Sequence, residues 1–220
     1  MLIGALLSAL NGAIAKILSD DISAMEIVFF RNMIGVILVL YALKHTPPKL
    51  NGGKLFMLLT RGFFGFSAMI LFFYTITVIP LGEAITLNKT SPLFVSILAY
   101  YLLKEHLDAK VIFALLIGFL GIIFITKPFG VIISYEHFLG ILGGLFAAMA
   151  YTTIKKIKDI YDARVIVLSF VGMGTILPAL LFLIAPYFDA PPSLAFLFPE
   201  FSYPTSFKIW FLIFCMAVIS

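Results

Sequence analysis

Apolar runs recur along most of the chain, and each is about 18 or more residues long, which is enough to cross the roughly 30 Å hydrocarbon core of a bilayer. In lipid only helices and closed barrels satisfy their backbone polar groups, and runs of this length predict helices. Breaks in hydrophobicity place eight candidate spans at about 2–18, 23–43, 54–78, 82–103, 109–127, 137–154, 163–186 and 206–220. The predicted fold class is therefore an all-α polytopic membrane protein.

Composition supports this class. Hydrophobic residues make up 62% of the chain and charged residues 12%, with a mean hydropathy of +1.14. Soluble domains have about 45–50% apolar and about 25% charged residues. The lone Cys215 excludes an internal disulfide and any multi-cysteine metal site, and the modest net charge of +4 gives no support for a nucleic-acid partner. The first apolar run ends in "AKILSDD" rather than at a small-residue cleavage site, which predicts a spanning helix and not a signal peptide.

Basic residues fall unevenly on the two sides of these spans. If the N-terminus is cytoplasmic, the cytoplasmic side receives Lys44, Lys49, Lys54, Arg61, Lys104, Lys110, Lys155, Lys156, Lys158 and Arg164. The other side receives mainly acids, among them Asp20, Glu83 and Glu136. Because membrane proteins carry an excess of Lys and Arg in cytoplasmic connections, this distribution predicts a cytoplasmic N-terminus.

A stripe of small residues occurs twice, first in the span 2–18 and again 136 residues later, through Gly4, Ser8 and Gly12 and then Gly140, Gly144 and Ala148. Such stripes let helix backbones approach closely in lipid. The connection after the first copy is acidic and the one after the second is basic, as an inverted repeat of five spans predicts. The alternative is that glycine stripes, which are common in membrane helices, align by chance.

Two repeats of five spans require ten spans, whereas the apolar runs stop within the eighth at "FLIFCMAVIS". We therefore expect a first repeat in residues 1–130 and a second, incomplete repeat in residues 131–220. The sequence is then a fragment or truncated, or the repeat interpretation is wrong.

A series of motifs runs through residues 26–128, in "FFRNMIG", "RGFFGFSAMILFFYTITVIPLGEAITLNKTSPLFVSILAYYLLKEHL" and "GFLGIIFITKP". It contains Arg31, Pro80, Ala84, Pro92, Glu105, the Gly118/Gly121 pair and Lys127-Pro128. In order and spacing this series resembles the drug/metabolite transporter superfamily, EamA type. The second half of the chain matches only in its general pattern.

The resemblance implies ten helices in two inverted repeats with both termini in the cytoplasm, and movement of small organic solutes such as amino acids, commonly outward. We expect a secondary transporter of the bacterial inner (plasma) membrane that works by alternating access, in export or exchange. Its expected partners are a small-molecule solute and the bilayer, with no cofactor, metal or catalytic residue. The alternatives are a membrane-embedded enzyme, such as a lipid-group transferase, and a channel or assembly subunit.

Polar residues concentrate in "GEAITLNKTSPLF", residues 82–94, inside a predicted span. Ionisable residues at membrane depth usually face a bundle interior or a wet cavity. Lys89 is the deepest, about 12 Å past Leu81 at about 1.5 Å per residue, and it either lines a cavity or snorkels or pairs structurally. Pro92 removes the helical hydrogen bond to the Asn88 carbonyl, which predicts a helix break; an ordinary proline kink is the alternative.

The predicted substrate-binding or pathway residues are Lys89, Asn88, Arg31, Ser91, Thr86, Glu83, Asn11 and Tyr151. The Arg31 guanidinium suits bidentate capture of a carboxylate, either from a solute or from Glu83 or Glu26, and the structural pairing is favoured because an unpaired Arg is costly. Glu105 is expected to be a structural acid at the inner end of its span. His45, His106 and His137 are placed in connections and receive no role.

Overall fold

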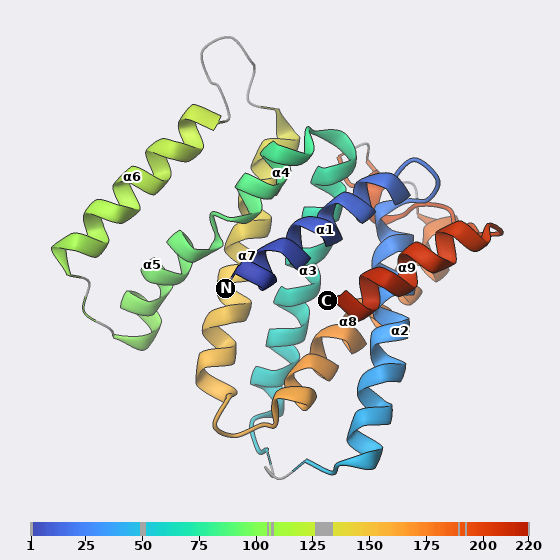
Figure 1. Cartoon of the computed structure of the whole chain (residues 1–220), viewed down its shortest axis with the longest axis horizontal. Helices are drawn as coiled ribbons and strands as arrows, with labels where there is room; N and C mark the ends of the chain where they lie inside the picture. Colours follow the sequence, from blue (N-terminus) through green and yellow to red (C-terminus); the bar gives the residue numbers. More distant parts are fainter. Residues whose placement is uncertain are drawn as a thin grey trace.

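The computed structural model describes residues 2–48, 52–104, 106, 108–125, 134–188, 190–191 and 193–219. These residues form helices and contain no strand (Figure 1). The α-helices are α1 (Leu2–Leu18), α2 (Ala24–His45), α3 (Leu55–Val78), α4 (Leu81–Asn88), α5 (Ser91–Leu103), α6 (Ala109–Ile125), α7 (Tyr135–Ile157), α8 (Ala163–Ile184) and α9 (Phe207–Ile219), with 3₁₀ turns η1 (Ala185–Tyr187) and η2 (Ala195–Leu197). The predicted all-α fold is confirmed.

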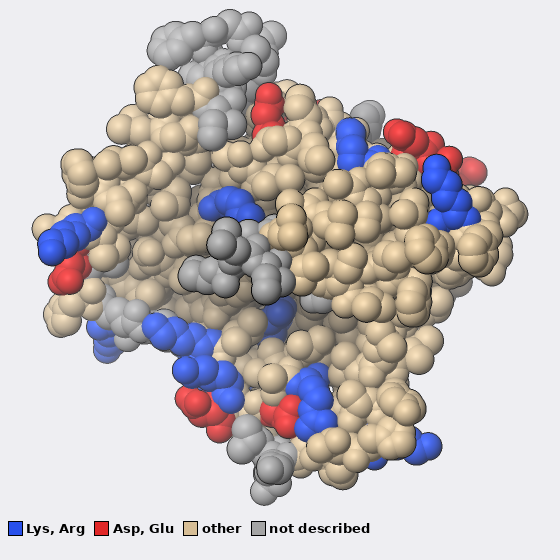
Figure 2. Space-filling view, in the orientation of Figure 1, with Lys and Arg blue, Asp and Glu red and all other residues tan. Residues whose placement is uncertain are grey.

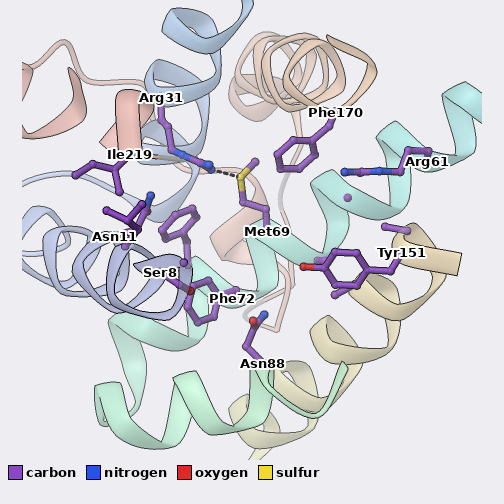
Figure 3. Close-up of a pocket in the computed structure, with 17 residues that line it drawn as sticks. Ser8, Asn11, Arg31, Arg61, Met69, Phe72, Asn88, Tyr151, Phe170 and Ile219 are labelled. Carbon is purple, nitrogen blue, oxygen red and sulfur yellow. Dashed lines mark hydrogen bonds between the residues drawn. The ribbon is translucent and has the colours of Figure 1, made fainter. Parts of the chain in front are cut away.

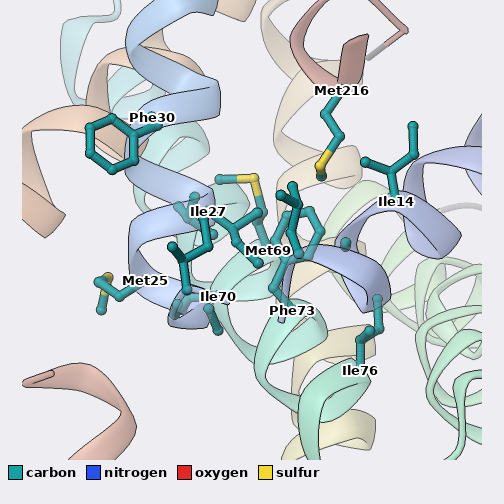
Figure 4. Packing of buried hydrophobic residues seen from close by; sticks show 14 of the residues in the cluster. Ile14, Met25, Ile27, Phe30, Met69, Ile70, Phe73, Ile76 and Met216 are labelled. Atoms are coloured by element: carbon teal, nitrogen blue, oxygen red, sulfur yellow. The ribbon is translucent and has the colours of Figure 1, made fainter. Parts of the chain in front are cut away.

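Helix α3 lies in the middle of the bundle (Figure 1), where it packs against α7 and α8, while α2 packs against α8 and α9. The hydrophobic core lies between these helices, and Figure 4 shows its members at Ile14, Met25, Ile27, Phe30, Met69, Ile70, Phe73, Ile76 and Met216. Burial of apolar side chains from α1, α2, α3 and α9 together thus fixes how the two ends of the chain meet. Both termini lie near the middle of the view in Figure 1.

The outer surface carries many large apolar side chains, such as Phe56, Phe124 and Phe207, which are 79%, 74% and 83% exposed. Patches of this kind mark a surface that contacts lipid or protein rather than water. By length and composition four helical segments can cross a membrane, namely α2, α3, α7 and Ala163–Tyr187, whereas α1, α6 and α9 are shorter apolar helices. In Figure 2 most of the face is uncharged, and Lys and Arg gather toward the lower edge, where α2 ends and α3 begins in Figure 1.

The predicted span 82–103 is two helices, because α4 ends at Asn88 and α5 begins at Ser91. The N–H of Lys89 donates to the Ile85 carbonyl at 2.9 Å, and the N–H of Thr90 donates to the Leu87 carbonyl at 3.1 Å. A 3₁₀-type bond therefore tightens the end of α4. The predicted break exists, but it lies before Pro92. Pro92 is in the first turn of α5, where backbone N–H groups have no helical acceptor, so its missing N–H costs no helical hydrogen bond.

Glycines of α7 pack directly on this break. A Cβ at Gly144 would overlap the Thr90 hydroxyl and lie 3.2 Å from the Leu87 carbonyl, while a Cβ at Gly140 would lie 2.7 Å from the Leu87 side chain. The small-residue stripe predicted for the sixth span thus lets α7 approach the backbone between α4 and α5.

A second proline, Pro178, lies inside α8. Proline has no N–H, so the Gly174 carbonyl has no i+4 donor in its own helix. The Asn32 side chain of α2 donates to this carbonyl at 3.4 Å and also to the Val28 carbonyl at 2.8 Å. In lipid a freed backbone carbonyl needs such a partner, and here a neighbouring helix supplies it.

The N-terminus of α2 is closed by a capping box, in which Ser23 and Glu26 bond one another's backbone N–H groups. Glu26 is 2% exposed, and its second carboxylate oxygen accepts from the N–H and hydroxyl of Ser202, at 2.6 and 2.9 Å. This acid therefore joins the start of α2 to the segment that leads into α9.

Candidate functional site

A cavity of about 540 Å³ lies inside the bundle (Figure 3). Its lining comes from α1, α2, α3, α4, α7, α8 and α9, through Gly4, Leu7, Ser8, Asn11, Arg31, Arg61, Gly65, Ala68, Met69, Phe72, Phe73, Asn88, Ala147, Ala150, Tyr151, Phe170 and Ile219. Small-molecule sites are usually about 300–1,000 Å³ and combine apolar walls with a few polar groups. The cavity therefore has the size and lining of a site for a small organic molecule.

Four of the predicted pathway residues line this cavity together: Asn11, Arg31, Asn88 and Tyr151. Figure 3 shows them arriving from different helices. The Asn11 amide also donates to the Met216 carbonyl at 3.3 Å, so this side chain joins α1 to α9 at the cavity wall. Asn88 reaches the cavity as the last residue of α4, because the helix ends there.

Arg31 has no carboxylate partner among the described residues. Its Nη1 lies 2.6 Å from the Met69 sulfur, its Cζ lies 5.8 Å from the centroid of the Phe73 ring, and its Nε is buried without a hydrogen bond. A thioether is a weak acceptor, so most of the hydrogen-bonding capacity of the guanidinium is unused. The favoured pairing of Arg31 with Glu26 or Glu83 is wrong, because both acids have other partners.

Glu83 bonds His137 instead, with 3.3 Å between Oε2 and Nε2. The other ring nitrogen of His137, Nδ1, lies 2.8 Å from the Ser134 hydroxyl. The placement of His137 in a connection is also wrong, since it lies buried in the first turn of α7. Glu83 therefore ties α4 to α7 and does not line the cavity.

The other predicted pathway residues lie outside the cavity lining. Lys89 is exposed, and the Thr86 hydroxyl donates to the Gly82 carbonyl at 2.8 Å within its own helix. Ser91 is buried at the start of α5, and Pro92 beside it is exposed. Roles for these residues in a solute pathway stay predictions. Further residues of the motif series and of the charge pattern, Lys49, Glu105, Lys127 and Pro128, lie outside the described residues.

Arg61 is the cavity residue that sequence reasoning missed. Its Cζ lies 5.0 Å from the centroid of the Phe170 ring, and its Nε and Nη1 are buried without a hydrogen bond among the described residues. The charge pattern had assigned it to the cytoplasmic side, because it lies near the start of a span. The signal that could have found it is its position inside the predicted span 54–78, seven residues past the start.

The sequence matches the EamA-like transporter family over residues 1–127. It is similar to an uncharacterized transporter of Helicobacter pylori, with 32% identity over 196 residues, which is 87% of this chain and 64% of that protein. It is also similar to the pseudopaline exporter CntI of Pseudomonas aeruginosa, with 29% identity over 213 residues, or 94% of this chain and 68% of the exporter.

A third relative is an S-adenosylmethionine uptake transporter of Rickettsia prowazekii, with 26% identity over 217 residues, or 96% of this chain and 72% of that protein. The chain thus spans slightly under two thirds of the Helicobacter pylori relative. The family match covers more than half of the chain and includes the α4–α5 break together with Arg31 and Arg61. On this match and on its apolar helices, the chain is an integral membrane protein that belongs to the EamA-like transporter family.

Proposed function

We propose that the chain forms the solute pathway of a secondary transporter that moves a small organic metabolite across a bacterial inner membrane by alternating access. The observation that carries this proposal is the cavity, which is large enough for a metabolite and is lined by polar side chains in an otherwise apolar bundle. Polar groups at membrane depth are costly unless they face a wet cavity or a partner. A solute pathway accounts for both the space and the polar lining.

Helix contacts support two inverted repeats in residues 1–130 and 131–220. In the first half α3 is the third helix, and it packs on α7 and α8, the first and second helices of the other half. In the second half α9 is third, and it packs on α1 and α2. In each half the third helix therefore packs on the first and second helices of the other half. This reciprocal pattern is expected of two repeats that enclose a central site.

The names of similar proteins support a small metabolite as the cargo, since one relative is named as a pseudopaline exporter and another as an S-adenosylmethionine uptake transporter. The two names differ in direction, so the direction of transport has to come from the assay. Lys89, Thr86, Ser91 and Glu83 are proposed to join the pathway in another state of the alternating cycle. In support, Lys89 directly follows the cavity residue Asn88 at the break between α4 and α5.

Solute counterflow tests the proposal. The purified protein is reconstituted in proteoliposomes and screened against amino acids, nucleosides, organic acids and cofactors, each inside and outside the vesicles. We expect saturable exchange of at least one solute, and no exchange in vesicles without the protein. Folded protein that exchanges none of these classes would contradict a metabolite transporter.

A further inference from the structure

We propose that Arg31 and Arg61 form a two-point anion site, and that the solute is a small organic dianion with an acidic group at each end, such as a dicarboxylate. The inference rests on the proposed function for transport, but its binding part stands on the cavity alone. Three observations carry it: the missing partners of the two guanidiniums, the direction of the Arg61 side chain, and the spacing of the two charges.

The cavity lining holds two cations and, among the described residues, no Asp or Glu. Arg31 and Arg61 together leave three buried guanidinium nitrogens without a hydrogen bond. Burying a charge without a partner is costly, and the cost is recovered when an opposite charge arrives in the same low-dielectric space. Carboxylates are the natural partners, because guanidinium N–H groups bind them in pairs.

Arg61 points away from the nearer membrane interface. It lies six residues after the start of α3, about 9 Å along the axis, so its long side chain would ordinarily snorkel back to the interface. Helical side chains also lean toward the N-terminus, which for α3 is the same direction. The guanidinium instead lies over Gly65, one turn deeper into the bundle.

Gly65 makes this position possible. A Cβ at residue 65 would overlap Nη1 of Arg61 and would lie 2.7 Å from the Phe170 ring. The glycine therefore leaves space for the guanidinium between α3 and α8, and the face of Phe170 attracts the cation there. In Figure 3 Arg61 and Arg31 enter from opposite sides, with Met69 and Phe170 between them.

The two cations contact α3 at different depths. Arg31 contacts Met69, which follows Arg61 by eight residues, or about 12 Å, on α3. Arg61 reaches about one turn of roughly 5 Å toward Met69, which leaves about 7 Å between the two contact points along the axis of α3, before the sideways separation of the two arginines is counted. A dianion with an acidic group at each end can give each guanidinium its own carboxylate across such a separation.

Uncharged polar residues line the rest of the cavity, below the two arginines in Figure 3. Asn88, Tyr151 and Ser8 line the same cavity and can donate to or accept from hydroxyl or amide groups in the middle of a solute. The lining is thus suited to a substituted dicarboxylate rather than to a purely apolar chain.

Equilibrium binding to the purified protein in detergent tests this inference without transport. The probes are succinate and adipate, butyrate as a monoacid of matched length, and putrescine as the corresponding diamine, each measured by calorimetry at fixed ionic strength. We expect at least one dicarboxylate to bind about tenfold or more tightly than butyrate, and putrescine not to bind. Equal affinities for butyrate and both dicarboxylates would overturn the two-point site.

Variants then test the Arg61 end of the proposed anion site. Arg61→Gln and Gly65→Ala should both reduce dicarboxylate affinity about tenfold or more while leaving weak butyrate binding at Arg31 unchanged. Lys44→Gln is the matched control, because Lys44 is an exposed cation at the other end of the same helix as Arg31. If Gly65→Ala does not fold, as judged by gel filtration, Arg61→Gln alone tests this end of the site, because it adds no Cβ against the Phe170 ring. Unchanged dicarboxylate affinity in Arg61→Gln would exclude Arg61 from the site.

Counterflow separates this inference from the proposed function. Dicarboxylate binding without exchange of any solute would contradict the transporter and leave the anion site standing. Exchange of neutral solutes at the same rate in Arg61→Gln and in the unsubstituted protein, without dicarboxylate binding in either, would overturn the anion site and leave the transporter standing.

Discussion

Charged side chains at the helix ends differ sharply from those in the cavity. At the ends, two cations join separate elements: Lys16 of α1 donates to the Ile76 carbonyl at the end of α3, at 2.7 Å, and Arg164 of α8 donates to Asp162 and to the Thr46 carbonyl after α2, at 2.9 and 2.6 Å. In the cavity Arg31 and Arg61 have aromatic and sulfur neighbours but no acid among the described residues.

The difference is between cations that bond neighbouring segments and cations that have unused hydrogen-bonding capacity inside the cavity. A cation at a helix C-terminus stabilises the helix through its exposed carbonyls and its dipole, and it remains close to water. A buried cation without an anion lowers stability. Under the proposed anion site, a bound dianion would offset the cost of burying these two cations.

The largest effect is expected for Arg31→Gln. Removing one partner of a buried charge pair costs about 2–5 kcal/mol, so exchange of an acidic solute should fall by about 30-fold or more. Thermal unfolding in detergent without solute should occur at the same or a higher temperature, because no internal ion pair is lost. A lower midpoint with normal exchange would place Arg31 among the structural charges.

Glu26→Ala is expected to lower stability and leave solute affinity unchanged, the reverse of Arg31→Gln. This change leaves the N–H groups of Ser23 and Ser202 without their acceptor, which should cost about 1–3 kcal/mol in the free energy of unfolding. Solute affinity at the cavity should stay unchanged, because Glu26 does not line it. Glu26→Gln, which keeps one acceptor oxygen, serves as the graded control for denaturant unfolding.

A smaller effect is expected for the Glu83–His137 contact between α4 and α7. A double-mutant cycle with Glu83→Gln and His137→Asn should give a coupling free energy of about 0.2–1 kcal/mol, because Glu83 is partly exposed and the pair is screened. The cycle is measured by denaturant unfolding in detergent. A coupling near zero would mean that the contact does not help to fasten the two helices.

The smallest effect on binding is expected for Lys89→Gln. Lys89 is exposed and lies outside the cavity lining, so solute affinity should stay within about twofold of the unsubstituted protein. Counterflow should nevertheless slow, because Lys89 is proposed to join the pathway in another state. A tenfold loss of affinity would show that Lys89 contacts the solute in the bound state.

Local patterns were enough to predict the helices and part of the cavity. Run length predicted the all-α fold. The proline and polar residues near Asn88 predicted a helix break, which the structure places between the end of α4 at Asn88 and the start of α5 at Ser91. Arg31 was assigned to a pathway from its guanidinium chemistry and Asn88 from its place at the predicted helix break, and both line the cavity. These properties depend on composition and axial position, which a sequence contains directly.

Properties set by the neighbours of a helix were not predicted. Axial position suggested an interfacial Arg61, but Gly65 and the Phe170 ring on another helix turn its side chain inward. The exposure of Lys89 depends on how α4 is rotated. That rotation is limited by the close contact of Gly144 with Thr90, two residues that are 54 positions apart in the sequence. His137 was missed because its partner, Glu83, comes from a distant helix.

The amide that Asn32 gives to α8 has a mechanical consequence. Because Pro178 donates nothing to the Gly174 carbonyl, α8 can bend there by releasing a single side-chain bond worth about 0.5–1.5 kcal/mol. Asn32 directly follows Arg31, and both side chains contact the Met69 sulfur, at 3.7 and 2.6 Å. This bond lies one residue along α2 from the proposed anion contact. We expect Asn32→Leu to speed hydrogen exchange of α8 around Gly174, because the Gly174 carbonyl then has no side-chain donor.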